Sequence, residues 1–456
     1  MIRIVKKYIF ALAALLCGAF AMSCNDELDD IKDYADNDNL LKLFAVSYGT
    51  SQYYANINYD DFTMSLSDIV YGELITSVKY VLEDGATISP IPGEATWAES
   101  QTYTVTLDGK SEKYTFSLPD YADLVDFKSV GYITSAYWQY DSVIETIDWS
   151  NLSHVILSFL QVNTDGSYTE TANLTSKMSD LKSKAANNDF KLMIAVQSSS
   201  TNGNTSGDFY TAINSESTRA TLIENLVTYM RDRDLDGIDI DFEEYNRVSS
   251  TAYATFLKEL KVAIEEAEES DDRDYLYSIA VAPNISGYPT DLGSTVDFIN
   301  LMLYDFSQSY TNAQHASYSS FTSYMTSSEA KFGATKRQLI GGLPFYGYTY
   351  DGLGTVTTTS SGTQKAYSEI FPAYVNKTSG DVTYTPLYIA DNDQVANTVY
   401  NGRVTLANKC QYVVDNSFGG VMIWHIGQDI FDTSYEDYKL LTVIGETIEF
   451  IEGKGL

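Results

Sequence analysis

The chain has 456 residues and a formal net charge of −33 at pH 7, because 62 acidic residues outnumber 29 basic ones. This excess of negative charge repels polyanions and makes nucleic acid a poor partner, so we expect no nucleic-acid binding. Hydrophobic residues form 44% of the chain and aromatic residues 13%, which excludes a wholly disordered protein and provides for a sizeable core.

The first 23 residues are typical of a signal peptide. Three basic residues precede an apolar run over residues 8–22, which is too short for the ~20 residues of a membrane-spanning helix. The small residue Ser23 directly before Cys24 resembles the lipobox of bacterial lipoproteins, in which that cysteine becomes the lipidated N-terminus. We therefore predict that residues 1–23 are removed and that Cys24 anchors the protein to outer-membrane lipid. An ordinary secretory signal with an incidental cysteine is the alternative.

Residues 24–40 are predicted to form an acidic linker. Its segment NDELDD at 25–30 resembles the surface-export signal of lipoproteins in Bacteroidetes-type bacteria, which implies a location at the cell surface. A solvated, flexible tether is a compatible explanation. After lipidation, Cys410 is the only cysteine left, so we expect no intramolecular disulfide.

Residues 41–120 carry short alternating runs that predict an all-β domain. The runs at 102–107 and 113–118 flank Asp108-Gly109, a combination typical of a β-hairpin with a tight turn. Further strand-like pieces at 77–82 and 86–91 predict a small sandwich. It resembles the immunoglobulin-like modules that precede enzyme domains in secreted bacterial lipoproteins.

Residues 127–450 alternate between apolar strands and helix-like segments such as 217–231 and 252–269. Eight buried strands separated by helices predict an α/β fold of the (β/α)8 TIM barrel type, in which the strands are parallel. An insertion rich in Tyr, Thr and Ser is expected around 350–397. The eight predicted strands are 129–134, 154–159, 191–196, 237–242, 276–282, 298–304, 338–343 and 420–426.

The segment DGIDIDFE at 236–243 carries the most chemical information. In a strand, alternate side chains share a face, so Asp239, Asp241 and Glu243 point one way while apolar residues point the other. In a barrel the apolar face packs on helices and the acids face the interior. Neighbouring carboxylates resist ionising together, a strain that functional sites use. Calcium binding or a solvated loop is the alternative, but the intervening apolar residues are unlike those of a calcium loop.

The same segment resembles the D-x-x-D-x-D-x-E signature of glycoside hydrolase family 18, the family of chitinases and certain endo-β-N-acetylglucosaminidases. Further resemblances follow in order at MLYD 302–305, GLPFYG 342–347 and GGVMIW 419–424, with looser ones at 131–132 and 158–159. Two segments depart from the family pattern. Residues 195–200 (AVQSSS) replace Ser-x-Gly-Gly, and Glu244-Tyr245 replaces Tyr-Pro.

The resemblance implies substrate-assisted hydrolysis, in which the sugar's own acetamido oxygen attacks the anomeric carbon and the configuration is retained. Glu243 would act as general acid and then base, and Asp241 would orient the acetamido group. Asp239 would tune Asp241, and Tyr304 would hydrogen-bond the acetamido oxygen. Asp236 and Gly237 complete the motif, with a structural role for Asp236, which lies off the parity of the other acids.

Six further residues are candidates for binding the sugar. Trp424 would form the apolar floor beneath the reacting ring, although barrel core is its alternative role, and Trp138 would stack a sugar farther along the cleft. Tyr132 and Tyr346 are wall candidates that could equally be structural. The complete predicted substrate-binding set is Trp424, Asp305, Met302, Tyr346, Tyr132 and Trp138.

The predicted function is a retaining endo-glycosidase that hydrolyses β-1,4-linked N-acetylglucosamine glycans, as chitinases do. An endo-β-N-acetylglucosaminidase that cuts the chitobiose core of N-glycans would use the same acids, and a non-hydrolytic glycan-binding protein is a third possibility. The three histidines, His154, His315 and His425, lack metal-ligand spacing, and no phosphate-binding loop is present, so we predict neither metal nor cofactor.

Overall fold

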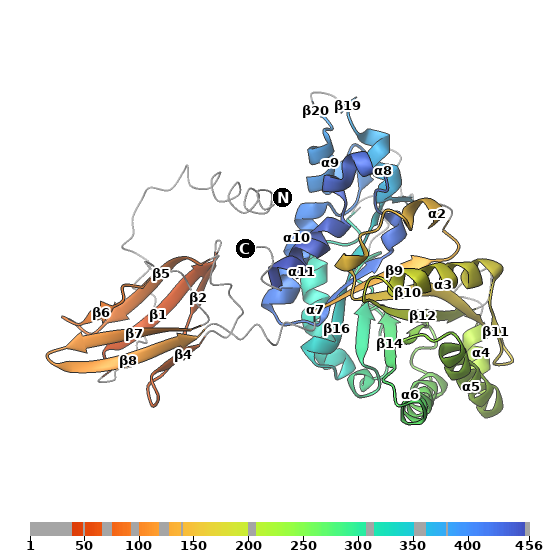
Figure 1. Ribbon diagram of the computed structural model, residues 1–456, viewed down its shortest axis with the longest axis horizontal. Coiled ribbons are helices and arrows are strands. Elements are labelled where there is room, and N and C mark those ends of the chain that lie inside the picture. Colours follow the sequence, from red (N-terminus) through yellow and green to blue (C-terminus); the bar gives the residue numbers. More distant parts are fainter. Residues whose placement is uncertain are drawn as a thin grey trace. The chain divides into compact units, whose positions relative to one another are not determined.

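The computed structural model describes ten segments and divides into two compact units, residues 1–125 with 453–456, and residues 126–452 (Figure 1). The predicted leader, Cys24 and Trp138 lie outside the described residues. Within the described segments, none of the helices combines the length and hydropathy needed to span a membrane. The described segments are 39–48, 51–65, 75–92, 100–117, 127–137, 140–198, 207–306, 314–350, 362–379 and 382–451.

The N-terminal unit contains two sheets, with strand orders β2-β1-β5 and β3-β4-β8-β7-β6. Neighbouring strands are antiparallel except for β4 and β8, which are parallel. Phe44 of the first sheet packs on Tyr103 and Phe116 of the second, with ring centroids 5.3 and 5.0 Å apart, so the sheets share a core. The predicted all-β sandwich is confirmed. Its strands are β1 Leu41–Tyr48, β2 Ser51–Tyr54, β3 Asn56–Asn58, β4 Thr63–Ser65, β5 Ile75–Leu82, β6 Thr87–Ser89, β7 Ser100–Leu107 and β8 Lys110–Ser117.

The predicted hairpin at Asp108-Gly109 joins β7 to β8. Leu107 pairs with Lys110, so the loop has two residues. Both loop residues have positive φ, 49° at Asp108 and 84° at Gly109. A type I′ turn requires this conformation at both central positions, and Asp-Gly adopts it readily, which explains why this dipeptide sets the register of the pair.

The second unit is built around eight parallel strands that form a closed barrel, in the order β9-β10-β12-β13-β14-β15-β16-β23, with β23 paired back to β9. The predicted (β/α)8 barrel is therefore confirmed. β15 ends three residues before the predicted limit of 304, so residues 302–305 form a loop at its carboxyl end. The strands are β9 Lys128–Thr134, β10 His154–Val162, β12 Lys191–Ser198, β13 Gly237–Asp241, β14 Leu276–Val281, β15 Phe298–Leu301, β16 Leu339–Pro344 and β23 Gly420–Trp424.

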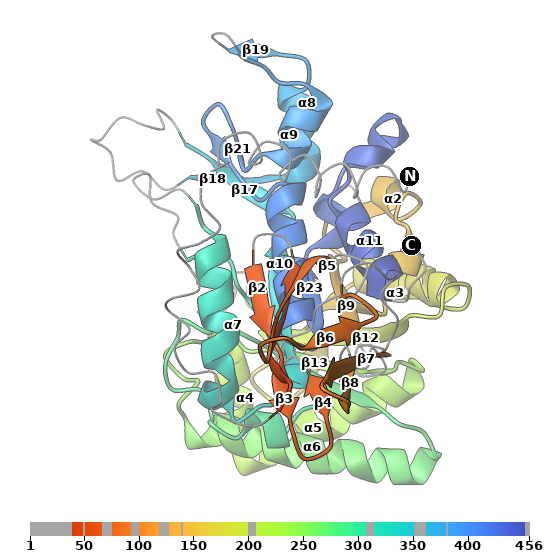
Figure 2. The ribbon, with the colours of Figure 1, turned by 90° about the vertical axis from the view of Figure 1, so that its left-hand side faces the viewer.

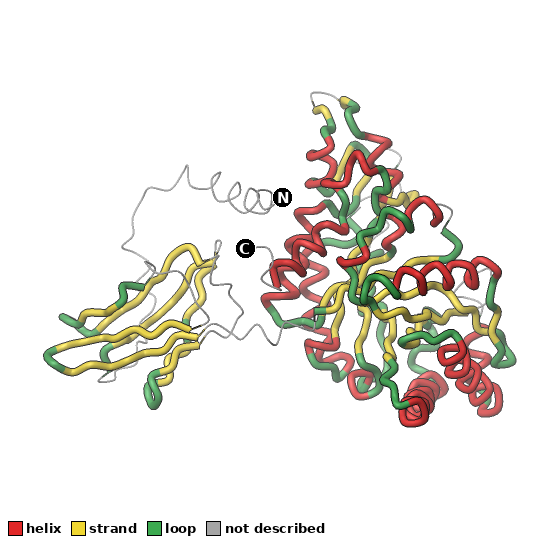
Figure 3. The backbone as a smooth tube through the Cα atoms, viewed as in Figure 1, coloured by secondary structure: helices red, strands yellow, loops and turns green. Residues whose placement is uncertain are grey.

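Helices surround the barrel, as Figures 1 and 3 show. In α6, Phe256, Leu260 and Ile264 recur at four-residue spacing on the buried face, and the Ser250 hydroxyl caps the first turn. Two connections lack a long helix: β9 leads to β10 through the short α2 Tyr140–Val143, and β14 leads to β15 through a single 3₁₀ turn, Leu292–Ser294. The longer helices are α3 Ala172–Ala185, α4 Asp208–Asn214, α5 Glu216–Asp232, α6 Thr251–Asp271, α7 Tyr318–Phe332, α10 Arg403–Asp415 and α11 Leu441–Ile451.

An insertion follows β16 and contains a four-stranded sheet with the order β18-β17-β22-β21. Figures 1 and 2 both place it at the end of this unit away from α5 and α6. It starts directly after the carboxyl end of β16, the end at which the acidic segment of β13 also finishes. Its elements are β17 Tyr346–Thr349, β18 Thr363–Ala366, α8 Tyr367–Tyr374, β19 Thr378–Ser379, β20 Val382–Thr383, α9 Pro386–Asp391, β21 Gln394–Val395 and β22 Thr398–Val399.

Side chains of the barrel strands divide into two cores by strand parity. Ile238, Ile240 and Phe242 belong to the large core between strands and helices. Inward residues such as Met193 and Ile340 belong to a separate core inside the barrel. The alternation in β13 therefore directs its acids into the barrel interior, as the sequence predicts.

Candidate active site

Three carboxylates enter the barrel from β13 and the residues after it. Asp239 is fully buried and Asp241 is 4% exposed, whereas Glu243 is half-buried. Gly237 is the first residue of β13. The position requires a glycine, because a Cβ there would lie 2.1 Å from the Leu276 carbonyl oxygen on β14. The three acids thus form a row that rises from the barrel interior to its mouth.

Asp239, the deepest acid, accepts hydrogen bonds from side chains on three other barrel strands, β9, β14 and β15. The Tyr132 hydroxyl donates to Oδ2 at 2.7 Å, and the Ser278 hydroxyl donates to Oδ1 at 2.5 Å. The Asn300 amide donates to Oδ1 at 3.2 Å and to the Tyr132 oxygen at 2.9 Å. These bonds hold the Asp239 carboxylate in one orientation beneath Asp241.

Asp241 and Glu243 share one donor. The Gln197 amide nitrogen, at the end of β12, lies 3.1 Å from Asp241 Oδ2 and 3.3 Å from Glu243 Oε1. The Tyr245 hydroxyl donates to Glu243 Oε2. Within the described segments, Asp241 Oδ1 is buried and has no hydrogen-bond partner. A buried carboxylate oxygen without a donor is able to accept a hydrogen bond from a ligand N–H.

Burial dominates the ionisation of the two deeper acids. It raises the pKa of Asp239 from 3.8 to about 6, against the lowering effect of its hydrogen bonds to Ser278, Tyr132 and Asn300. Burial also raises the pKa of Asp241 well above its ordinary value, and the charges of Glu243 and Asp239 add to this effect. Such perturbed, mutually coupled carboxyl groups are typical of acid–base sites.

Tyr304 and Asp305 lie in the loop after β15. The Tyr304 hydroxyl contacts the Met422 sulfur at 3.9 Å, a weak acceptor. Asp305 has a φ of 59°, and its Oδ1 accepts from the Tyr348 hydroxyl at 2.8 Å and lies 3.1 Å from His315 Nδ1. Burial works to raise the pKa of Asp305, but these partners hold it below its ordinary value. Asp305 is therefore held as an anion at the barrel mouth.

Trp424 is the last residue of β23, and its side chain is half-buried. Its ring stacks on Phe159 at 5.9 Å and is tilted against Tyr132 at 5.7 Å. Met302 is also half-buried and packs on the same inner core. Tyr132 and Tyr346 are each 1% exposed, so neither offers much surface to a sugar. Their burial favours a role in supporting other site residues rather than a role in forming a wall of the cleft.

Asp236 lies apart from the other acids, at the opposite end of β13. Its Oδ2 accepts from the Leu192 backbone N–H at 2.8 Å, and its Oδ1 from Arg273 at 3.1 Å. These contacts join β12, β13 and the turn before β14. The structural role of Asp236 stays a prediction, and these contacts give it a physical basis.

The sequence did not single out several residues that hold the acids. Ser278 and Asn300 could have been found from strand parity, because both lie on inward positions of predicted strands. Gln197 belongs to the segment that departs from Ser-x-Gly-Gly. That departure indicated a change at the end of the third barrel strand but did not indicate which residue contacts the acids. His315 contacts Asp305 only because the chain returns after β15, and nothing local indicates this.

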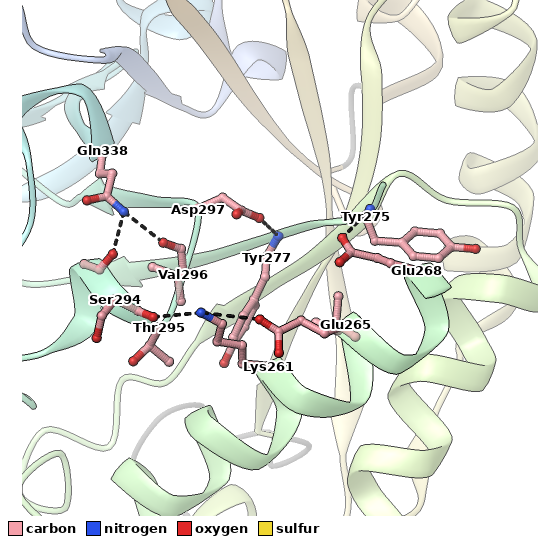
Figure 4. Close-up of a pocket in the computed structure, with 12 residues that line it drawn as sticks. Lys261, Glu265, Glu268, Tyr275, Tyr277, Ser294, Thr295, Val296, Asp297 and Gln338 are labelled. Atoms are coloured by element: carbon pink, nitrogen blue, oxygen red, sulfur yellow. Dashed lines mark hydrogen bonds and ion pairs between the residues drawn. The ribbon is translucent and has the colours of Figure 1, made fainter. Parts of the chain in front are cut away.

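A separate pocket lies at the amino ends of β14 to β16, away from the acids (Figure 4). Its polar groups satisfy one another: Lys261 donates to the Ser294 carbonyl, and Gln338 donates to the carbonyls of Gly293 and Val296. In TIM-barrel enzymes, the face at the amino ends of the strands contributes to stability, whereas catalysis takes place at the opposite face. Nowhere in the described segments do three or more His, Cys, Asp or Glu side chains form a group suited to a metal ion.

Comparison with known proteins bears on the barrel. Residues 128–429 match the family model of glycosyl hydrolases family 18. A chitinase structure from Bacteroides thetaiotaomicron is 31% identical with a TM-score of 0.57, and the match covers 70% of this chain and 96% of that one. A family 18 chitinase from the chitin utilization locus of Flavobacterium johnsoniae is 25% identical, with a TM-score of 0.57 and coverages of 70% and 93%.

Curated relatives are more distant. A probable endochitinase of Caenorhabditis elegans is 26% identical over 273 residues, which are 51% of this chain and 44% of that protein. Chitinase B of Serratia marcescens is 23% identical over 367 residues, 61% of this chain and 73% of that protein. The family model spans the barrel from its first strand past its last, and the acids stand within it. The chain belongs to the glycosyl hydrolases of family 18.

Proposed function

We propose that this protein is a retaining endo-glycosidase that hydrolyses β-1,4-linked N-acetylglucosamine glycans by substrate-assisted catalysis. The observation that carries the proposal is the unpartnered, buried Oδ1 of Asp241 between two further carboxyl groups. The N–H of an acetamido group on the sugar is the donor that this oxygen lacks. Glycans with N-acetylated sugars supply such a group at the reacting ring.

Glu243 begins the reaction as general acid. It protonates the leaving glycosidic oxygen while the acetamido oxygen attacks the anomeric carbon, which gives a cyclic oxazolinium ion. Its position at the barrel mouth, half-buried and hydrogen-bonded by Gln197 and Tyr245, suits contact with a bound glycan. Glu243 then removes a proton from the water that opens the oxazolinium ring. Two inversions at the anomeric carbon give net retention.

Asp241 and Tyr304 orient the acetamido group. Asp241 accepts the acetamido N–H and stabilises the positive charge that develops on the ring. The Tyr304 hydroxyl, whose described partner is only the Met422 sulfur, donates to the acetamido oxygen. Asp239 tunes Asp241 through their charge coupling. The half-buried indole of Trp424 provides the apolar floor beneath the sugar.

The named relatives favour a chitin-type substrate. The proteins from Bacteroides thetaiotaomicron and Flavobacterium johnsoniae are described as chitinases, and both align over more than nine-tenths of their length. We therefore propose chitin oligomers or polymers as the substrate. Cleavage of the chitobiose core of N-glycans uses the same acids and is treated as an outcome of the test.

The test is product analysis by mass spectrometry after incubation with chitooligosaccharides and, separately, with a high-mannose glycoprotein. We expect short N-acetylglucosamine oligomers from the former, and their loss in Glu243→Gln. Glu259→Gln, on the outer surface of α6, is the matched control and should retain activity. Release of N-glycans that lack one N-acetylglucosamine would replace the chitinase proposal by the endoglycosidase. Binding without any product would replace it by a non-hydrolytic glycan-binding protein.

We also propose that Cys24 is lipidated and anchors the protein to the outer membrane, facing the cell surface. The proposal is supported by the basic and apolar leader, by Ser23-Cys24 and by the acidic residues that follow. In cells fed radiolabelled palmitate, the wild type should carry label and partition into detergent, whereas Cys24→Ala should do neither. Protease added to intact cells should degrade the wild type if it faces outward. An unlabelled wild type would leave an ordinary secretory signal as the explanation.

A further inference from the structure

The end of β12 departs from the family's Ser-x-Gly-Gly motif, and the structure places Gln197 of this segment at the acids. We propose that Gln197 is a positioning residue that fixes Asp241 and Glu243 relative to each other through one bridging amide. This inference rests on the function proposed above and names a residue that the motif does not contain. It assigns a role to the very segment that the family pattern leaves unexplained.

The geometry of the bridge suits a side-chain amide. Gln197 Nε2 lies 3.1 Å from Asp241 Oδ2 and 3.3 Å from Glu243 Oε1. An NH₂ group carries two hydrogens, so it can donate one to each carboxylate at the same time. Val196 is the last residue of β12 paired with β13, opposite Ile240, so the next residue on each strand is Gln197 and Asp241. Adjacent strands thus bring the amide and the carboxylate side by side.

Among the described residues, Gln197 is the one hydrogen-bond donor to Asp241, since Oδ1 has no partner. Glu243 differs, because Tyr245 donates to its second oxygen. Without the bridge, repulsion between two neighbouring carboxylates would favour their separation. The bridge ties Asp241 Oδ2 to the amide that also holds Glu243, and leaves Oδ1, which has no described donor, available to the acetamido N–H.

The bridge also affects proton binding. Burial is the largest cause that raises the pKa of Asp241, and the charges of Glu243 and Asp239 raise it further. The hydrogen bond from Gln197 lowers this pKa. Loss of this donor would raise that pKa further. Because Asp241 must be ionised to stabilise the oxazolinium ion, activity would then fail at a higher pH on the acid side. The other titratable groups whose charges couple to Asp241 are Tyr132, Tyr245, Tyr253, Tyr288 and Tyr304.

The decisive variant is Gln197→Met, which nearly conserves volume and removes both donors. We expect kcat on chitooligosaccharides to fall by about tenfold or more, with a smaller change in KM, because the bridge aligns the reacting groups. We also expect the acid limb of the pH profile to move up by about half a pH unit or more. Gln411→Met is the matched control, since Gln411 makes the same kind of amide bond to Asp415, at 2.7 Å, on α10. The control should change neither kcat nor the acid limb.

Two results would overturn the inference. One is a Gln197→Met enzyme with wild-type kcat and pH profile. The other is a fall in kcat with an unmoved acid limb, which would indicate a space-filling role. Gln197→Ala supplies the same test if the methionine variant does not fold, as judged by its thermal melt.

Failure of the proposed function is distinguished by a measurement that needs no turnover. In protein labelled with ¹³C at the Asp side-chain carboxyl, the Asp241 resonance is identified by its absence in Asp241→Asn. Its titration midpoint should rise in Gln197→Met relative to the wild type. A wild type that turns over no N-acetylglucosamine glycan refutes the proposed function, whereas an unmoved midpoint refutes the bridge.

Discussion

Replacing Asp239 by Asn should make the stability of the barrel less sensitive to pH. Burial raises the pKa of Asp239 from 3.8 to about 6, although Tyr132, Ser278 and Asn300 all donate to it. A carboxyl group whose pKa is raised by folding stabilises the native state below its unfolded pKa. That contribution is lost as the pH rises through the folded pKa, because the buried group must then ionise.

The structure sets the size of this effect. The difference between 3.8 and about 6 corresponds to about 3 kcal/mol, since a tenfold change in an ionisation constant is ~1.4 kcal/mol. Asn cannot ionise, so the free energy of unfolding of Asp239→Asn, minus that of the wild type, should increase by about 2 kcal/mol between pH 4 and pH 7, because pH 4 already lies above the unfolded pKa of 3.8. Loss of the Asp239 charge also relieves Asp241, which changes the difference in the same direction.

Urea unfolding, followed by tryptophan fluorescence from pH 4 to pH 8, measures this difference. The baseline of the variant can differ, because its amide must direct Nδ2 to a hydroxyl such as that of Tyr132, but a constant offset leaves the trend unchanged. Asp274→Asn, at an exposed position, controls for the loss of one negative charge. A difference that stays flat or decreases between pH 4 and pH 7 would refute the assignment of a buried, proton-binding Asp239.

Three further outcomes test separate parts of the structure. Gly237→Ala should destabilise the barrel by about 3 kcal/mol or more in thermal or urea unfolding, because its Cβ would meet the Leu276 carbonyl at 2.1 Å; wild-type stability would contradict this packing. Asp236→Ala should lose about 2 kcal/mol of stability through its bond to the Leu192 N–H, yet keep the wild-type pH profile of activity; a shifted profile would contradict its structural role. Trp424→Ala should weaken binding of chitotetraose by about tenfold in calorimetry, and unchanged affinity would exclude the indole as the floor.

Much of the fold followed from the sequence because its pattern is local. In β13, Ile238 and Ile240 alternate with Asp239 and Asp241, so strand parity alone predicts which side chains face the helices and which enter the barrel. The hairpin at Asp108-Gly109 was equally local, since only that dipeptide has to adopt positive φ. Each of these predictions depends on residues within a few positions of one another.

Other parts depend on contacts between segments that are separated along the chain. His315 reaches Asp305 only after the chain returns from β15, and Tyr348 reaches it from the insertion. Comparison with the Ser-x-Gly-Gly motif marks the segment of Gln197 only as a departure from the family pattern. It cannot show which residues the longer glutamine side chain contacts. The half-buried or buried state of Trp424 and Tyr132 likewise depends on packing against Phe159 and other strands.

The distribution of donors along the acidic face bears on how the site treats charge. Among the described residues, Tyr132, Ser278 and Asn300 donate to Asp239, whereas Gln197 alone donates to the buried Asp241. Gln197 and Tyr245 both donate to Glu243. In the described part of the chain, no cationic side chain contributes to setting the pKa of Asp241. The free site therefore leaves Asp241 poorly stabilised as an anion. An oxazolinium ion beside it would supply both the missing N–H and a positive charge, so the arrangement favours the charged intermediate over the neutral substrate.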